Sequence, residues 1–314
     1  MNALTASGLN LDIWPEETPP SPQALLQHIA GAEGLITMLS DRIDARVLEA
    51  AGPQLRVISQ MAVGVDNIDL DACTARGIPV GHTPGVLSDA VADLTIGLML
   101  ATTRRLIEAA EDVKAGRWQS WSPMGWVGPS LYDSTVGLVG MGRIGLAVAR
   151  RLTGFGVRIL YHNRHVHPQA AQVGATLVDL DTLLAESDFV SLHCPYTPET
   201  HHLIDAAALA RMKPSATLIN TARGGVVDQD ALMDALRSGQ IRAAGLDVTT
   251  PEPLPATHPL LSLPNVVVLP HIGSAGQRAR SKMAEMTVQN LLAGLAGEPL
   301  PWCANPQVYA ASQD

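Results

Sequence analysis

A glycine-rich turn between an apolar strand and a helix is the feature that most constrains how this chain can fold. The segment GLVGMGRIG at 137–145 carries the G-x-G-x-x-G pattern at Gly140, Gly142 and Gly145. Gly140 permits a tight turn, Gly142 lets a ligand approach the backbone, and Gly145 lets the helix lie close to the strand. Because a helix start offers unpaired N–H groups to an anion, the pattern predicts a dinucleotide site. The alternative is a tight strand-to-helix turn without a ligand.

Strand-like and helical runs alternate along most of the 314 residues, which predicts parallel sheets with crossover helices. We expect strands at 9–14, 34–39, 55–62, within 76–84, and at 134–140, 157–163, 189–195, 216–222, 243–248 and 266–270. We expect helices at 24–31, 45–51, 88–115, 143–153, 229–238 and 275–297. Asp228 and Gly239 have the residue types that begin and end a helix. The last helix is expected to return to the first α/β unit, so one domain would be inserted into the other.

Composition argues against several classes of partner. The net charge is −9 without a long Lys/Arg run, which disfavours nucleic acid and anionic membrane surfaces. The apolar stretch 90–103 is interrupted by Asp93 and is too short to span a bilayer. Cys73, Cys194 and Cys303 have neither metal-ligand nor redox-motif spacing, which fits a cytoplasmic protein. The start of the chain has no basic residues followed by an apolar run, so we expect no signal peptide.

The end of the strand after the glycine turn indicates which dinucleotide is bound. Enzymes that use NAD usually place Asp or Glu there, but this chain has His162, Asn163, Arg164 and His165. Arg164 would attract a 2′-phosphate, so we predict that NADP is preferred and that NAD is possible. The alternative is that Arg164 is a solvated loop charge. The spacing of His162, His165 and His167 lacks neighbouring carboxylates or thiolates, so we predict no metal site.

Three polar residues follow later strands, where an open parallel sheet places its ligands. They are Arg223, Glu252 and His271. A 2-oxo acid needs a cation for its carboxylate and a proton donor for its carbonyl oxygen, and Arg and His suit these tasks. Glu252 could bond the distal nitrogen of His271 and favour its protonated form. Taken singly, the three residues could instead be a strand-end cap, a loop charge and a core histidine.

The chain resembles the D-isomer-specific 2-hydroxyacid dehydrogenases over roughly residues 9–302. The stretches that carry the resemblance are MAVGVDNIDL (61–70), GLVGMGRIG (137–145), NTARGGVVDQDAL (220–232), AAGLDVTTPEPLP (243–255) and PHIGSA (270–275). HPLLSLPNVVVLPHIGSAGQRAR and NLLAGLAGEPLP are most similar to the glyoxylate reductase/hydroxypyruvate reductase branch. The implied fold is α/β with two doubly wound parallel-sheet domains. A Rossmann-type dinucleotide-binding domain (88–278) is inserted into a smaller flavodoxin-like substrate domain (1–87 and 279–314).

The resemblance also implies roles for individual residues. Arg223 would bind the substrate carboxylate, with help from the backbone N–H groups of Val63 and Gly64. Ser274 would lie beside the substrate. Glu252 would pair with His271, the proton donor. The cofactor would be contacted along its length by Gly140, Gly142, Arg143, Ile144 and Gly145 at the pyrophosphate, by Asn163 and Arg164 at the 2′-phosphate, and by Thr221 and Asp247 near the nicotinamide.

The implied activity is NAD(P)H-dependent reduction of glyoxylate to glycolate and of hydroxypyruvate to D-glycerate. Alternatives are a dehydrogenase for another D-2-hydroxy acid or for phosphite, and a dinucleotide-sensing binding protein. The resemblance further implies a homodimer in which the helix at 88–115 and the following loop cross between subunits, so that Trp121 or Trp126 reaches the partner's active site. Members of the family generally begin with an extra strand and helix ahead of the segment that starts at Leu9. The sheet of the small domain is therefore expected to lack these elements, unless the true start lies upstream.

Overall fold

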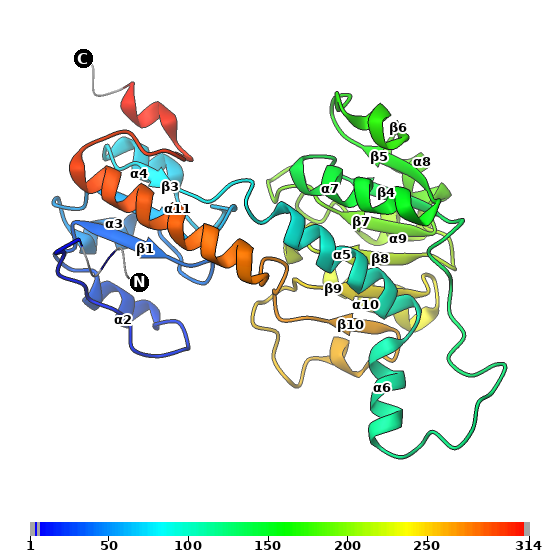
Figure 1. Cartoon of the computed structure of the whole chain (residues 1–314). Helices are drawn as coiled ribbons and strands as arrows, with labels where there is room; N and C mark the ends of the chain where they lie inside the picture. The colour runs from blue at the N-terminus through cyan, green and yellow to red at the C-terminus, as the bar shows by residue number, and fades with distance from the viewer. Residues whose placement is uncertain (1–3, 5–6, 311–314) are drawn as a thin grey trace. The chain divides into compact units, whose positions relative to one another are not determined.

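The computed structural model describes residue 4 and residues 7–310, so most of the segment ahead of Leu9 lies outside the described residues. The chain divides into two compact units (Figure 1). Unit 1 comprises Met1–Leu87 and Gln277–Asp314, and unit 2 comprises Ser88–Gly276. The second division lies two residues before the predicted boundary at 278, because helix α11 begins at Gln277 and packs on the strands of unit 1.

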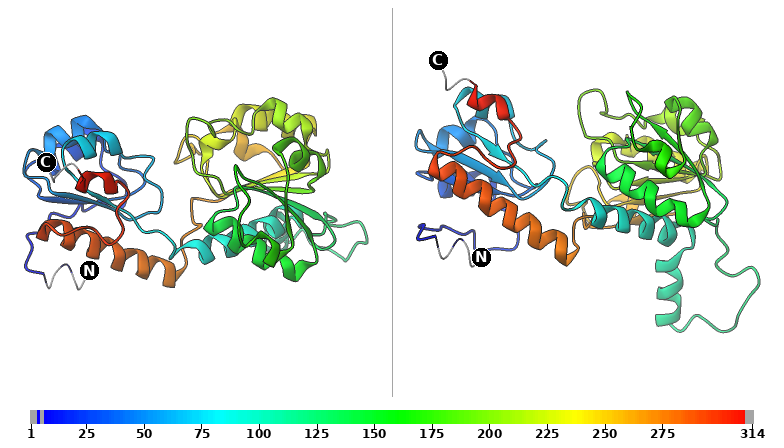
Figure 2. Two further views of the ribbon diagram at one scale, coloured as in Figure 1. Left: turned by 90° about the horizontal axis from the view of Figure 1, so that it is seen from above. Right: turned by 45° about the horizontal axis from the view of Figure 1, so that its top comes forward.

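Unit 1 is built on a three-stranded parallel sheet in the order β1-β2-β3, with helices on both faces (Figure 2). Its elements are β1 (Gly34–Thr37), β2 (Val57–Gln60), β3 (Val80–Gly81), α2 (Pro22–His28), α3 (Ala45–Ala51), α4 (Leu70–Ala75) and α11 (Gln277–Ala296). Ile58 faces the core that α2, α3 and α4 share. Val57, the preceding residue, packs against Leu291 of α11 on the other face. The alternation along β2 therefore buries the sheet on both sides.

The strand predicted at 9–14 is absent from the structure, where these residues form irregular backbone. Trp14 Nε1 donates to the carbonyl of Thr18 at 2.8 Å, and the Trp14 ring meets His28 edge-on, with 5.0 Å between centroids. Ile13 is 57% exposed. The strand prediction was wrong here. Among the described residues, no strand pairs with 9–14, and Trp14 contacts Thr18 and His28 instead.

Unit 2 is built on a seven-stranded parallel sheet in the order β10-β9-β8-β7-β4-β5-β6. Its strands are β4 (Thr135–Val139), β5 (Arg158–His162), β6 (Ala175–Leu177), β7 (Phe189–Leu192), β8 (Thr217–Asn220), β9 (Ala243–Leu246) and β10 (Val266–Val268). Its α-helices are α5 (Ser88–Thr103), α6 (Leu106–Lys114), α7 (Arg143–Leu152), α8 (Leu180–Glu186), α9 (Ala206–Arg211) and α10 (Gln229–Ser238). The strand order reverses at β4, which is the switch point where open parallel sheets bind ligands.

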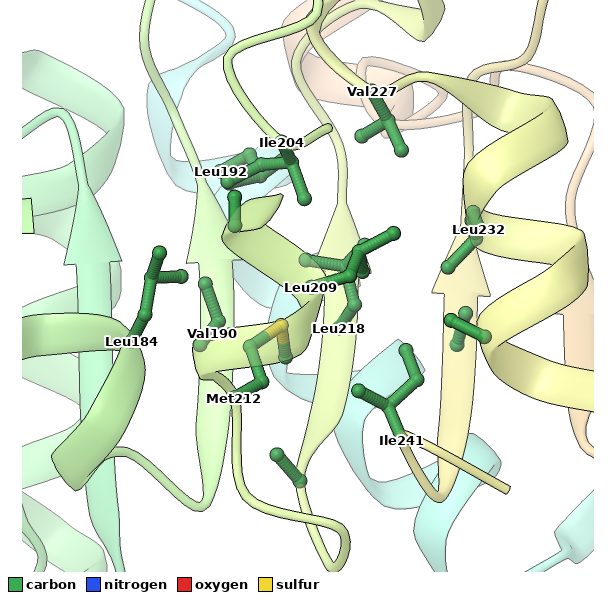
Figure 3. Packing of buried hydrophobic residues seen from close by; sticks show 14 of the residues in the cluster. Leu184, Val190, Leu192, Ile204, Leu209, Met212, Leu218, Val227, Leu232 and Ile241 are labelled. Carbon is green, nitrogen blue, oxygen red and sulfur yellow. The ribbon is translucent and has the colours of Figure 1, made fainter. Parts of the chain in front are cut away.

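Two apolar clusters fill the two faces of this sheet. Leu138 belongs to the cluster under α5 and α7, and its neighbour Val139 belongs to the cluster under α8, α9 and α10. Figure 3 shows the second cluster, in which Leu209 of α9 lies over Val190 and Leu218 of adjacent strands. Because successive strand residues point to opposite faces, every central strand is apolar on both sides, as expected for a parallel sheet.

The predicted helix at 88–115 is in fact two helices, α5 and α6. Arg105, between them, adopts a left-handed conformation with φ of 53°, which an α-helix cannot contain. Its guanidinium lies 4.6 Å from the ring centroid of Trp126, and its Nε lies 3.3 Å from Glu108 Oε1. No glycine or proline lies at the break, so the sequence pattern does not predict it. Figure 1 shows α6 and the following loop extending away from the sheet.

Helix caps explain where several short helices begin. The side chains of Asp69, Asp179 and Asp205 each accept a hydrogen bond from a backbone N–H in the first turn of α4, α8 and α9. Neither these helices nor β6 follows from the sequence pattern alone. The predicted cap of α10 is confirmed, since Asp228 accepts from Ala231 N and the helix ends at Gly239 with φ of 71°. No helix in the described part of the chain is long and apolar enough to cross a bilayer.

We expect Leu218→Ala to lower the free energy of unfolding by about 2–5 kcal/mol, because Leu218 is fully buried in the core of unit 2 and truncation leaves a cavity. Urea denaturation followed by circular dichroism measures the change. The control is Leu261→Ala, at a side chain that is 45% exposed. Equal losses in the two variants would contradict the assignment of the core.

Candidate active site

The glycine turn lies at the carboxyl end of β4. Gly140 has φ of 95°, and a Cβ atom at this position would lie 2.6 Å from the backbone nitrogen of Cys194. A Cβ atom at Gly145 would overlap the carbonyl oxygen of Gly140. These two positions therefore require glycine for internal reasons, the first for the turn and the second for the approach of α7 to β4.

Gly142 is different, since a Cβ atom there would meet nothing within 4 Å. It is the N-cap residue of α7 and has no side chain with which to bond the first-turn N–H groups. Arg143 is exposed beside it and Ile144 is half-buried. An open glycine at a helix start fits the close approach of a pyrophosphate, so these residues can hold a dinucleotide.

Asn163 braces the glycine turn. Its Oδ1 accepts from Met141 N at 2.7 Å, and its Nδ2 donates to Met141 O at 3.3 Å. The predicted contact of Asn163 with a 2′-phosphate therefore competes with two bonds to the turn. Arg164, the next residue, is exposed. The pKa of Glu199 is lowered chiefly by its hydrogen bond with Thr197, and in smaller part by the positive charge of Arg164.

The three histidines of the H-x-x-H-x-H spacing do not form a ligand cluster. His162 Nδ1 lies 3.1 Å from Val178 O, and His167 Nδ1 accepts from Gln169 N at 3.2 Å. Among the described residues, no group of three or more His, Cys, Asp or Glu side chains could hold a metal ion.

A carboxylate and an imidazole meet beyond the ends of β9 and β10. His271 Nδ1 lies 2.8 Å from Glu252 Oε2, and Glu252 Oε1 accepts from Thr249 N at 2.9 Å. Burial alone would raise the pKa of Glu252, but the hydrogen bonds from His271 and Thr249 and the positive charge of Arg223 outweigh it and lower that pKa. Arg223 is half-buried, and its Nη1 donates to Ala222 O at 2.8 Å. Because Nδ1 is engaged, Nε2 of His271 is the nitrogen left to serve a substrate.

A buried aspartate shapes the turn that carries this histidine. His271 has φ of 54°, and its backbone N–H donates to Asp247 O at 2.9 Å. The side chain of Asp247 accepts from Ile272 N at 2.8 Å and from Gly273 N at 2.7 Å. Burial raises the pKa of Asp247, although these two N–H groups partly offset it. Both of its oxygens are thus occupied by the turn.

The remaining predicted site residues belong to both units. Thr221 is buried after β8, with its Oγ1 3.0 Å from Thr95 Oγ1. Ser274 is half-buried three residues after His271. Val63 and Gly64 belong to unit 1, in the loop after β2, whereas all the residues above belong to unit 2.

Comparisons with known proteins agree on one family. The sequence model of the protein family described as D-isomer specific 2-hydroxyacid dehydrogenase, NAD binding domain, matches residues 96–273. This chain belongs to the D-isomer-specific 2-hydroxyacid dehydrogenase family. The glyoxylate reductase/hydroxypyruvate reductase of Mus musculus is 52% identical over 94% of this chain and 91% of its own length. The glyoxylate/hydroxypyruvate reductase B of Escherichia fergusonii is 51% identical over 92% of this chain and 90% of its own.

Solved structures extend the likeness to three dimensions. A Thermus thermophilus protein superposes with a TM-score of 0.90 at 49% identity, covering 96% of this chain and 95% of its own. The NADPH-dependent glyoxylate/hydroxypyruvate reductase of Sinorhizobium meliloti, in complex with NADP and malonate, has a TM-score of 0.78 at 38% identity, covering 87% and 84% of the two chains. The Rossmann-type α/β fold of this 2-hydroxyacid dehydrogenase is therefore shown.

His193 is a neighbour of the glycine turn in this dehydrogenase that sequence reasoning missed. Its backbone follows β7 and lies against Gly140, and its Nε2 lies 2.9 Å from Ser191 Oγ. Burial lowers its pKa to about 4, so the ring is neutral near pH 7. Its Nδ1 is buried without a protein partner among the described residues. The only hint in the sequence is that His193 directly follows an apolar strand. Without the fold, such a histidine cannot be distinguished from a core residue.

We expect Gly142→Val to weaken the binding of NADPH by at least about 10-fold, since the added side chain would occupy the space open to the pyrophosphate. Fluorescence titration measures the dissociation constant. The melting temperature of the free protein should fall far less than in Gly145→Val, because the new Cβ meets no protein atom within 4 Å. Gly145→Val is the contrasting control and should destabilise the fold itself. Unchanged NADPH affinity in a folded Gly142→Val protein would refute the assignment.

Proposed function

We propose that this protein reduces small 2-oxo acids with NAD(P)H, converting glyoxylate to glycolate and hydroxypyruvate to D-glycerate. The observation that carries the proposal is the Glu252–His271 pair with Arg223 close enough for its charge to lower the pKa of Glu252. The names of relatives that are about half identical over most of the chain support the choice of substrates.

In this mechanism Arg223 binds the substrate carboxylate through its planar fork. His271 donates a proton from Nε2 to the carbonyl oxygen, and Ser274 lies beside the substrate. A bound nicotinamide dinucleotide supplies the hydride that reduces C2. Glu252, whose pKa is lowered by its hydrogen bonds with His271 and Thr249, holds His271 Nδ1 at 2.8 Å and so orients the ring.

We expect His271→Ala to reduce kcat with glyoxylate by about 100-fold or more, because the proton donor is lost. Absorbance of NADPH at saturating glyoxylate measures turnover. The control is His28→Ala, at an exposed histidine of unit 1 that pairs with Asp12. Near-normal turnover in His271→Ala would remove His271 from the mechanism. A wild-type protein that binds NADPH but turns over none of glyoxylate, hydroxypyruvate, pyruvate and phenylpyruvate would instead indicate a dinucleotide sensor.

The preferred cofactor in this proposal is NADP, with NAD as a weaker alternative. Support comes from the exposed Arg164 after β5, from the lack of an acidic residue at 162–165, and from the relative solved in complex with NADP. In this proposal residues 88–276 are the dinucleotide-binding domain, with Arg143 and Ile144 at the pyrophosphate and Thr221 and Asp247 near the nicotinamide. Residues 1–87 and 277–314 are then the substrate domain.

We expect Arg164→Ala to lower kcat/KM for NADPH by about 10-fold while leaving kcat/KM for NADH nearly unchanged, since only NADPH carries the 2′-phosphate. The ratio of the two constants in one assay is the readout, and the wild-type ratio should exceed one. Arg150→Ala, at an exposed arginine of α7, is the matched control. A wild-type ratio below one would overturn the preference for NADP.

A homodimer in the cytoplasm completes the proposal. Helix α6 has no buried residues and exposes Leu106, Ile107 and Val113, an apolar surface that a second copy would cover. Trp126 lies beneath Arg105, whereas Trp121 is 78% exposed and is the better candidate to reach a partner's active site. The three cysteines are free thiols, as is usual in a reducing compartment.

A further inference from the structure

The turn that carries Glu252 has little packing to hold it in place. Residues 250–253 are exposed, and the Glu252 side chain itself is 37% exposed. Its two carboxylate oxygens nevertheless have fixed partners, Thr249 N at 2.9 Å and His271 Nδ1 at 2.8 Å. A displacement of the turn by 1 Å would break the second of these bonds. Within the turn, Thr249 Oγ1 also donates to Pro251 O at 2.8 Å, and a contact from outside the turn adds to this restraint.

Gln229 makes two hydrogen bonds to this turn. Its Nε2 donates to Thr250 O at 2.6 Å, and its Oε1 accepts from Thr250 N at 3.0 Å. The side-chain amide of Gln229 thus pairs with both the N–H and the C=O of Thr250, as the backbone of a neighbouring β-strand would. Because both bonds must break together, they restrain the rotation as well as the position of the peptide groups that flank Thr250.

The other end of this restraint is rigid. Gln229 is the first residue of α10, whose N-terminus is fixed by the Asp228 cap and whose apolar face is buried through Leu232 and Leu236. The chain segment before α10 also meets the turn directly. A Cβ atom at Gly224 would overlap Thr249 O, so the two backbones are in contact there.

We propose that Gln229 is a positioning residue that holds Glu252 against His271, and thereby sets the geometry of the proton donor. Gln229 itself contacts neither of these two side chains and acts through the backbone of Thr250. The same segment carries Arg223 six residues earlier, so the restraint also couples the carboxylate-binding cation to the imidazole–carboxylate pair. The inference deepens the proposed function and rests on it for its catalytic consequence.

The test compares Gln229→Ala and Gln229→Glu with wild type. Gln229→Ala loses both bonds, whereas Gln229→Glu keeps an acceptor for Thr250 N but has no donor for Thr250 O. We expect kcat with glyoxylate to fall by about 10-fold in Gln229→Ala and by about 3-fold in Gln229→Glu, with KM changing less than about 2-fold. Gln172→Ala, at an exposed glutamine of the 3₁₀ helix Ala170–Val173, is the matched control and should match wild type.

A second readout does not depend on turnover. The hydrogen bond from His271 helps to lower the pKa of Glu252, so loosening the turn should move that pKa up toward its ordinary value. Carbon-13 NMR titration of glutamate carboxyl groups measures the shift, with Glu252→Gln assigning the resonance. The pKa should rise in Gln229→Ala and stay unchanged in Gln172→Ala. Gln229→Glu is compared through kcat alone, because its new carboxylate would raise the pKa of Glu252 by charge repulsion.

An unchanged pKa of Glu252 in Gln229→Ala would overturn the proposal, whatever happens to kcat. A fall in kcat that only follows a fall in melting temperature, with no shift in this pKa, would likewise assign Gln229 a structural role. If Gln229→Ala does not fold, Gln229→Met, which loses both bonds without adding a charge, takes its place in the titration. If wild type reduces no 2-oxo acid but the pKa still shifts, the positioning role stands and the proposed function fails.

Discussion

Parallel pairing of β4 with both β5 and β7 is the constraint on which the rest of unit 2 depends. Strands that run in one direction bring all their carboxyl ends to one edge of the sheet. The glycine turn after β4, Arg164 after β5, His193 after β7 and Arg223 after β8 therefore share that edge. No single segment of the chain contains the site, and the sheet alone brings its parts to one side.

The glycines in the loops at this edge are of two kinds, which differ in how they tolerate substitution. Gly140, Gly145 and Gly224 sit where a Cβ atom would strike backbone, so the packing of the loops fixes these residues. Gly142 faces open space, so a ligand is the better explanation for it. This contrast separates the glycines that the packing of the loops requires from Gly142, which the spacing of the motif cannot do.

Electrostatics at the same edge follow from burial and from hydrogen bonds together. Burial raises the pKa of Asp247 even though two backbone N–H groups bond its side chain. Glu252 is also partly buried, but its hydrogen bond with His271 and the charge of Arg223 lower its pKa. Two carboxylates near one histidine thus have different tasks, since Asp247 shapes the backbone of the turn and Glu252 faces the ring.

The sequence by itself determined the parallel α/β organisation and the glycine turn, and it suggested Arg223, Glu252 and His271 as site residues, because these depend on local periodicity and on residue chemistry at strand ends. It also determined α10, whose cap and terminal glycine are local signals. Tertiary structure decided what depends on distant partners. Residues 9–14 form no strand, and the predicted helix is interrupted at Arg105. Asn163 bonds the backbone of Met141, and Gln229 bonds the backbone of Thr250. The last three of these outcomes involve contacts between segments that are separated in the chain, and the pattern of one segment carries no record of its partner.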